Sequence, residues 1–92
     1  MKHNTYFEGR VQSLSLATPE GHATVGVIEP GKYTFSTEKE ERLSIVAGAM
    51  KVKLPGSPDW HTVEAGDTFA VPAGKSFDVD AGADTAYICY YK

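Results

Sequence analysis

A chain of 92 residues is long enough for one folded domain with a single core. Hydrophobic residues make up 41% and charged residues 23% of it, which excludes the composition of a disordered protein. The net charge of −3 argues against a protein that binds nucleic acid through its phosphates, because such domains usually carry a basic face.

Other features of the composition indicate where the protein works. Cys89 is the single cysteine, so neither an internal disulfide nor a cysteine-based zinc site can form within the chain. No apolar run approaches the ~20 residues of a membrane span, and residues 1–10 lack the apolar stretch of a signal peptide. We therefore expect a cytoplasmic protein with no membrane partner.

Short apolar segments separated by turn residues follow one another along the chain, which is the pattern of β-strands. Residues 1–5 are expected to be a frayed tail. The charged residues 37–42 have no apolar stripe to bury and predict a solvated loop. The expected strands, about eight or nine in number and typical of a sandwich or barrel, are residues 11–16, 23–28, 32–36, 43–47, 50–54, 60–63, 68–71, 76–79 and 85–91.

Alternation of side chains along two of these segments predicts how they face the core. Residues 50–54 alternate apolar side chains with lysines, and together with residues 43–47 they predict a hairpin around Gly48 with one wet face. The last expected strand has two alternating sets of side chains, Tyr87, Cys89 and Tyr91 against Ile88 and Tyr90.

Residues 66–77 carry the most specific fold signal. Their spacing, Gly-x5-Pro-x-Gly-x2-Phe, resembles the second cupin motif, Gly-x5-Pro-x-Gly-x2-His, with Phe77 in the histidine position. Turns at Gly66-Asp67 and Pro72-Ala73-Gly74 are expected to reverse the chain so that residue 77 points inward.

A second resemblance lies upstream. Glu41, followed by six residues and Gly48, is similar to the end of the first cupin motif, in which a glutamate faces the barrel lumen. With residues 66–77 it implies an all-β fold, a single cupin domain over residues 1–92 that forms a double-stranded β-helix or jelly-roll barrel.

The histidines that metal-binding cupins carry just before this glutamate are absent. Residues 35–40 read Phe-Ser-Thr-Glu-Lys-Glu, and the chain has three histidines, His3, His22 and His61. His3 lies in the expected tail and His22 in an expected turn, and all three are expected at the surface. A histidine-based metal site needs several imidazoles that converge on one point, so we expect no bound metal.

Nearly the whole chain, about residues 6–91, carries a collinear resemblance to one small cupin family. The resemblance rests on residues 6–11, 23–27, 31–37, 41–48, 54–55, 59–60, 66–77 and 87–91. On these segments the chain resembles the broad-specificity pyrimidine/purine nucleoside phosphorylases. The resemblance implies that orthophosphate, as co-substrate, and a purine or pyrimidine nucleoside give a free base and ribose 1-phosphate, in a homodimer without a cofactor.

The residue inventory suits a sugar cation and a flat base. Glycosidic cleavage passes through an oxocarbenium-like transition state, so an inward Glu41 is expected to face the sugar cation or to hold ribose hydroxyls. The alternative is that Glu41 belongs to a solvated acidic run. Candidates for stacking against base and ribose, each of which can instead fill the core, are Tyr33, Phe35, Phe77 and Tyr90.

Phosphate needs hydroxyls, cations or backbone amides as donors. The candidates are Ser36, Thr37, Arg42 and Lys75, with Arg10 a weaker one, and a plain surface role is the alternative for each. The general acid for the departing base stays open among tyrosine, glutamate and water.

Two other classes of function remain open. A non-catalytic sugar-binding or nucleoside-binding cupin would keep the aromatic pocket but show no phosphate-dependent turnover. A structural or assembly module would have a lumen filled by its own side chains. A homodimer is also expected from the small size of the chain and from the edge strands of a short sheet.

Overall fold

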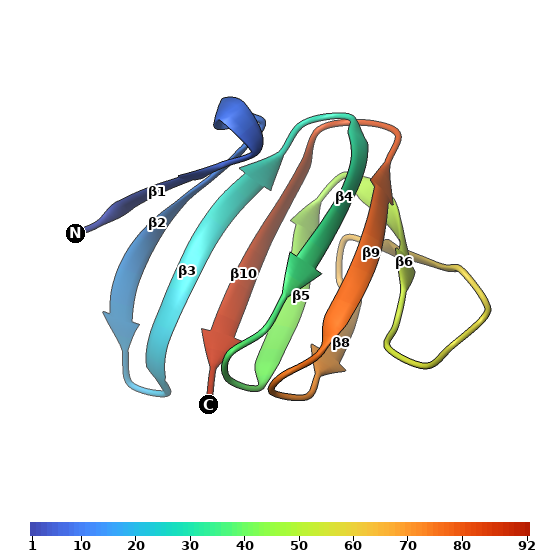
Figure 1. Cartoon of the computed structure of the whole chain (residues 1–92). Helices are drawn as coiled ribbons and strands as arrows, with labels where there is room; N and C mark the ends of the chain where they lie inside the picture. Colours follow the sequence, from blue (N-terminus) through green and yellow to red (C-terminus); the bar gives the residue numbers. More distant parts are fainter.

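The structure is a computed structural model that describes residues 1–92. Figure 1 shows an almost entirely β architecture with one short 3-10 helix, η1 (Phe7–Gly9). No helical segment has the length and hydrophobicity that a membrane crossing requires. The strands are β1 (His3–Tyr6), β2 (Val11–Thr18), β3 (Gly21–Ile28), β4 (Gly31–Ser36), β5 (Glu41–Ala47), β6 (Ala49–Lys53), β7 (His61–Glu64), β8 (Thr68–Val71), β9 (Ser76–Ala81) and β10 (Thr85–Tyr91).

The strands form two antiparallel sheets. One sheet has six strands in the order β1-β2-β3-β10-β5-β8, and the other has four in the order β4-β9-β6-β7. In Figure 1, β4 and β9 lie in front of β5 and β8, as in a jelly-roll barrel. Because β4 is an edge strand that does not pair with β2 or β3, the barrel wall is not closed by hydrogen bonds on that side.

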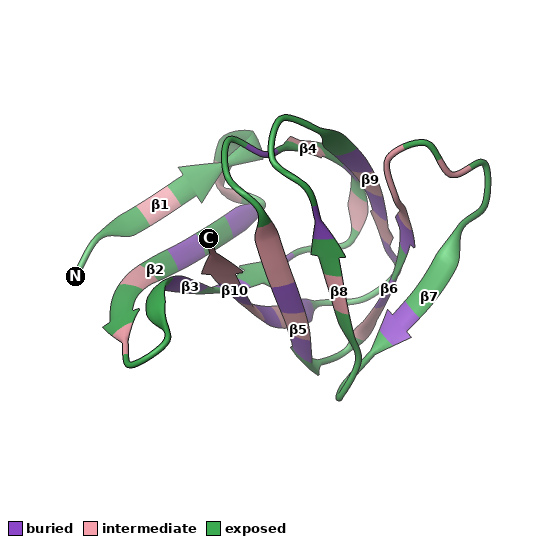
Figure 2. Ribbon diagram, turned by 90° about the horizontal axis from the view of Figure 1, so that it is seen from below, coloured by how far each residue is buried: buried purple, intermediate pink, exposed green.

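The core lies between the sheets and is built by side chains of alternate residues. On β9, for example, Phe77, Val79 and Ala81 are buried, while the residues between them are less so. Figure 2 shows buried positions on strands of both sheets. Burial of each large apolar side chain contributes roughly 1.5–3 kcal/mol, and the core includes Val11, Ile28, Leu43, Ile45, Met50, Val52, Val71, Phe77 and Val79.

The N-terminal residues differ from the expected frayed tail. Residues 3–6 form β1, which pairs with β2 in the register His3↔Leu14 to Tyr6↔Val11. The Asn4 side-chain amide donates to the Ser13 and Ser15 hydroxyls at 3.2 and 3.1 Å. Backbone pairing and a polar side chain hold this edge strand, which is why no apolar periodicity marks it.

The expected hairpin around Gly48 is wrong. β5 pairs with β10 and β8, whereas β6 pairs with β7 and β9, so the chain passes from one sheet to the other at Gly48. Gly48 has φ +81°, and a Cβ there would lie 2.3 Å from the Asp84 carbonyl oxygen. Glycine is therefore required at this corner by both conformation and space.

The turns predicted by the cupin spacing are confirmed. Gly66 and Gly74 have positive φ values of 95° and 72° at the two ends of β8. The chain then returns along β9, where Phe77 is only 4% exposed and points between the sheets. The spacing of the motif thus sets the inward direction of residue 77.

Candidate functional site

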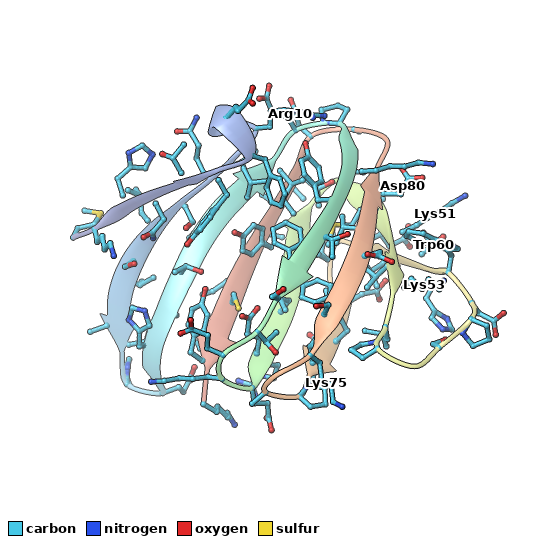
Figure 3. All side chains as sticks on the ribbon, in the orientation of Figure 1. Arg10, Lys51, Lys53, Trp60, Lys75 and Asp80 are labelled. Atoms are coloured by element: carbon cyan, nitrogen blue, oxygen red, sulfur yellow. The ribbon has the colours of Figure 1, made fainter.

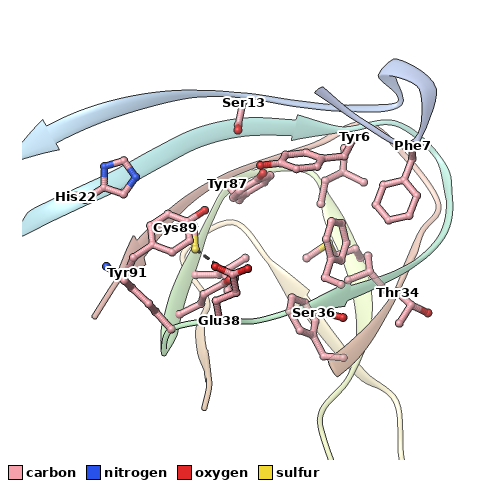
Figure 4. Close-up of a pocket in the computed structure, with 18 residues that line it drawn as sticks. Tyr6, Phe7, Ser13, His22, Thr34, Ser36, Glu38, Tyr87, Cys89 and Tyr91 are labelled. Carbon is pink, nitrogen blue, oxygen red and sulfur yellow. Dashed lines mark hydrogen bonds between the residues drawn. The ribbon is translucent and has the colours of Figure 1, made fainter. Parts of the chain in front are cut away.

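A cavity of about 610 Å³ opens between β4 and the six-stranded sheet. This volume lies within the range of small-molecule sites. Side chains from β2, β3, β4, β5, β6, β9 and β10 line it, together with residues 6–7 and the loop before β5 (Figure 4). The barrel lumen is therefore not filled by the protein's own side chains, as a purely structural module would require.

Three phenylalanine rings form an apolar end of the cavity. Phe35 and Phe77 are stacked with their centroids 5.5 Å apart, and Phe7 meets Phe35 edge-on at 5.4 Å. Phe7 and the following Glu8 both have positive φ, 51° and 58°, which is strained for side chains with a Cβ. This backbone places the Phe7 ring against the rings of β4.

One wall of the cavity is formed by alternate residues of β10. Tyr87, Cys89 and Tyr91 all line the cavity from this strand. Burial raises the pKa of Tyr87 and of Cys89 to about 12, and the pKa of Tyr91 is raised for the same reason. All three groups keep their protons near neutral pH and present two phenols and a thiol to a ligand.

Glu41 faces this wall from the first position of β5. It is half-buried, and the Cys89 thiol donates to its Oε1 atom at 3.6 Å (Figure 4). Burial raises the pKa of Glu41 above its usual value, while the thiol hydrogen bond acts in the opposite direction. A carboxyl group held in a partly dry cavity can stabilise developing positive charge or hold hydroxyl groups.

The other end of the cavity is polar and exposed. The His22 ring lies 5.3 Å from the Tyr91 ring, and the Tyr91 hydroxyl makes a 3.0 Å hydrogen bond with Thr24 Oγ1. Glu38 and Lys39 line the same cavity from the loop between β4 and β5. This end combines an imidazole, an ammonium group, a carboxyl group and a phenol with access to water.

Four residues that sequence analysis selected line the cavity: Glu41, Phe35, Phe77 and Ser36. They come from β4, β5 and β9, so strands far apart in sequence bring them together. The Ser36 hydroxyl lies 3.2 Å from that of Ser76 and is exposed. The structure thus places the carboxylate and two expected stacking rings in one site.

Two of the expected stacking residues do not line the cavity. Tyr33 is buried, and its hydroxyl donates to the Glu29 carbonyl at 2.7 Å. Tyr90 points to the opposite face of β10 from Cys89 and lies 5.1 Å from the Arg42 guanidinium. Tyr33 fills the core, and Tyr90 belongs to the outer surface.

The other expected phosphate ligands also lie outside the cavity. Arg42 covers Tyr90, and Lys75 is exposed in the turn before β9 (Figure 3). The buried Thr37 hydroxyl donates to the Pro72 carbonyl at 2.7 Å and holds that turn in place. Arg10 lies 5.1 Å from the Tyr33 ring centroid. These side chains have structural or surface contacts instead.

Several residues that line the cavity were not predicted from the sequence. His22 lies in β3 and not in a turn, and it remains exposed. His3 and His61 lie on other strands, and no group of three metal-ligating side chains is close enough to hold a metal ion. The alternation along β10 indicated that Tyr87, Cys89 and Tyr91 share one face of the strand. The residues that were not predicted include Tyr6, Phe7, Ser13, His22, Lys39, Tyr87, Cys89 and Tyr91.

Comparison with known proteins decides the family. A sequence profile described as pyrimidine/purine nucleoside phosphorylase matches residues 1–91. The chain belongs to this family. A pyrimidine/purine nucleoside phosphorylase of Pseudomonas putida strain F1 is 51% identical over 89 residues, which cover 97% of this chain and 95% of the relative. The phosphorylase of strain W619 is 50% identical over 91 residues, with coverages of 99% and 97%.

Solved structures support the same fold. A protein of unknown function from Vibrio parahaemolyticus superposes with a TM-score of 0.94 and 42% identity, covering 99% of this chain and 97% of that chain. More distant neighbours include the EutQ protein of Clostridium difficile, with a TM-score of 0.70 and 13% identity. Fe(II) HppE has a TM-score of 0.80 and 11% identity. These cupin-type neighbours confirm the all-β fold class expected for this chain.

Proposed function

We propose that this protein catalyses the phosphorolysis of purine and pyrimidine nucleosides to the free base and ribose 1-phosphate. Membership of the nucleoside phosphorylase family supports this activity class. The observation that carries the proposal is the position of Glu41, a half-buried carboxyl group in an open cavity that also contains stacked phenylalanine rings. This combination matches a substrate with a flat base and a sugar that becomes cationic.

The reaction exchanges one bond at C1′ of the ribose. A phosphate oxygen forms a bond to C1′ as the C1′–N bond breaks, and the electron pair of that bond leaves with the base nitrogen. The proton lost from the attacking phosphate hydroxyl balances the proton gained by the base. Glu41 as a carboxylate stabilises positive charge on the sugar during the exchange.

Broad base specificity follows from the kind of contacts that the cavity offers. The rings of Phe35 and Phe77 accept any flat base, because every base has a π-face. The Tyr87 hydroxyl can rotate to donate or accept a hydrogen bond, so it tolerates different base edges. Stacking with an adaptable polar wall therefore discriminates weakly between purines and pyrimidines.

The proposal includes no resident metal or organic cofactor, and orthophosphate is a co-substrate. Phe77 stands where the cupin motif has a histidine, and an aromatic ring offers no ligand of the kind transition metals prefer. It also includes a homodimer, which an exposed apolar face of the six-stranded sheet supports. A location in the cytoplasm belongs to the same proposal and is supported by the free, buried thiol of Cys89.

Phosphate dependence tests the function directly. Purified protein is incubated with uridine or adenosine, with and without phosphate, and free base and ribose 1-phosphate are measured. We expect both products only when phosphate is present. Equal release of base without phosphate would indicate a hydrolase, and absence of release with tight nucleoside binding would indicate a non-catalytic binding protein.

A further inference from the structure

The two ends of the cavity differ in chemistry, and we propose that this difference orients the substrates. Phosphate binds at the exposed end beside His22 and Lys39, and the base binds at the opposite end against Phe35 and Phe77, next to Phe7. The inference rests on the proposed function. It deepens that function by assigning phosphate binding to His22 and Lys39, which lie outside the sequence motifs.

The basic side chains of the cavity lie at one end. Lys39 and His22 are the basic residues among those that line it, and both are exposed. His22 lies beside Tyr91, and Tyr91 is paired with Glu41 across β10 and β5. The Lys92 amide donates to the Glu40 carbonyl at 2.9 Å, which fixes the loop that carries Lys39 next to the end of β10.

The phenylalanine rings lie at the other end. Tyr87 is paired with Gly26, and Tyr91 follows it four positions later, roughly 13 Å along a strand. Phe7 precedes β2, whose first residue pairs with Ile28 at the end of β3 that is far from His22. In Figure 4, Phe7 and His22 lie at opposite ends of the cavity, with Tyr87 and Cys89 between them.

Charge decides which substrate occupies which end. A phosphate dianion at the apolar end would lose its water without gaining cationic partners, which is strongly disfavoured. At the exposed end, the Lys39 ammonium, the His22 ring and the Tyr91 hydroxyl supply donors. Two carboxyl groups also line the cavity. Glu38 is exposed, as Lys39 is, and Glu41 is bonded to Cys89 deeper inside, so phosphate at this end is held by directional donors as well as by charge.

This orientation agrees with a direct displacement at C1′. The incoming phosphate oxygen and the departing base nitrogen lie on opposite faces of the sugar when a single displacement inverts the configuration. Base and phosphate at opposite ends, with the ribose beside Glu41 between them, satisfy that requirement. A β-nucleoside then gives the α anomer of ribose 1-phosphate.

Steady-state kinetics of three lysine variants and one histidine variant test the phosphate subsite. We expect Lys39→Gln and His22→Ala each to raise KM for phosphate about tenfold or more, with KM for the nucleoside changed less than about twofold. Lys32→Gln, an exposed lysine of β4 that does not line the cavity, is the matched control and should leave both values unchanged. The inference is overturned if Lys75→Gln raises KM for phosphate and Lys39→Gln does not.

Binding of phosphate without nucleoside separates this inference from the proposed function. Isothermal titration with inorganic phosphate should show weaker binding to Lys39→Gln than to the wild type and to Lys32→Gln. That result together with no release of base would support the subsite and refute phosphorolysis. Phosphate-dependent release of base with unchanged phosphate affinity in Lys39→Gln and His22→Ala would refute the subsite and keep the function.

Discussion

Glu41 lies half-buried in a cavity with mostly hydrophobic walls, and under the proposed mechanism this placement has opposite effects on catalysis and on stability. A carboxylate in such surroundings interacts strongly with a sugar cation because little water screens it. The same surroundings raise its pKa, since burial disfavours the charged form more than the Cys89 hydrogen bond favours it.

Replacement of Glu41 by Gln should remove the charge that the proposed mechanism uses while keeping the shape of the side chain. We expect kcat for phosphorolysis to fall about 100-fold with a small change in KM for the nucleoside, because the lost interaction forms in the transition state. Glu64→Gln, at an exposed position on β7, is the control and should retain full activity. Equal activity of wild type and Glu41→Gln would remove Glu41 from the mechanism.

The pKa of Glu41 also predicts how the stability of this variant depends on pH. Burial raises the pKa of Glu41 in the folded state. The contribution of this group to the stability of the wild type is therefore fully present below about pH 4.5, and it is lost as pH rises through the folded-state pKa. Glutamine cannot ionise, so the free energy of unfolding of Glu41→Gln, relative to that of the wild type, should be larger at pH 7 than at pH 4. Urea unfolding at both pH values measures this gain, and a difference that shrinks as pH rises contradicts the assignment.

At the scale of strands, the positions of the elements follow from local sequence more readily than their partners do. Residues 43–47 and 50–54 lie within or close to β5 and β6, as their alternation predicts. Their expected pairing is wrong, because alternation reports which side chains point inward and not which sheet the strand joins. The close approach of Gly48 to Asp84 decides the path, and it depends on the distant β9–β10 turn.

Replacement of Gly48 by Ala tests this corner. The positive φ and the clash of the new Cβ with the Asp84 carbonyl should lower the free energy of unfolding by about 2 kcal/mol or more. Gly82→Ala is a matched control, because a Cβ there meets nothing within 4 Å. Its free energy of unfolding should stay within about 0.5 kcal/mol of the wild-type value. Chemical denaturation of both variants measures the difference, and similar values for the two would contradict the role of Gly48.

In the candidate site, too, some residues could be predicted from nearby sequence, whereas others depend on the pairing of strands that are distant in the chain. Glu41 and Phe77 were predictable because short motifs tie each to a neighbouring turn. Tyr91 was accessible from alternation with Cys89, whereas Tyr90 has the opposite phase and points outward. His22 enters the site only through the pairing of β3 with β10, which no local spacing reveals.

At the scale of the whole molecule, the outer faces of the two sheets differ in polarity. On the six-stranded sheet, Leu14, Val25 and Ile88 stand in one row across three strands, and Leu14 and Val25 are 46% and 45% exposed. The four-stranded sheet carries lysine and aspartate on its exterior, including Lys51 and Asp80 (Figure 3). An apolar sheet face of this kind is typical of a surface that a partner covers.

We expect the proposed homodimer to use the apolar face of the six-stranded sheet. Light scattering at micromolar concentration should give twice the mass of one chain for the wild type. Val25→Lys places a charge at the centre of the row and should give the mass of one chain, because an unpaired charge in an interface is costly. Thr62→Lys, exposed on β7, should stay dimeric. A wild type with the mass of one chain would refute the dimer.

A crystal structure with a bound nucleoside, grown without phosphate, tests most directly whether the cavity between β4 and the six-stranded sheet is the catalytic site. We predict electron density for the base against Phe35 and Phe77, with C1′ of the ribose facing the Glu41 carboxyl group. A nucleoside bound elsewhere on the molecule, with the cavity occupied only by water, would contradict the account.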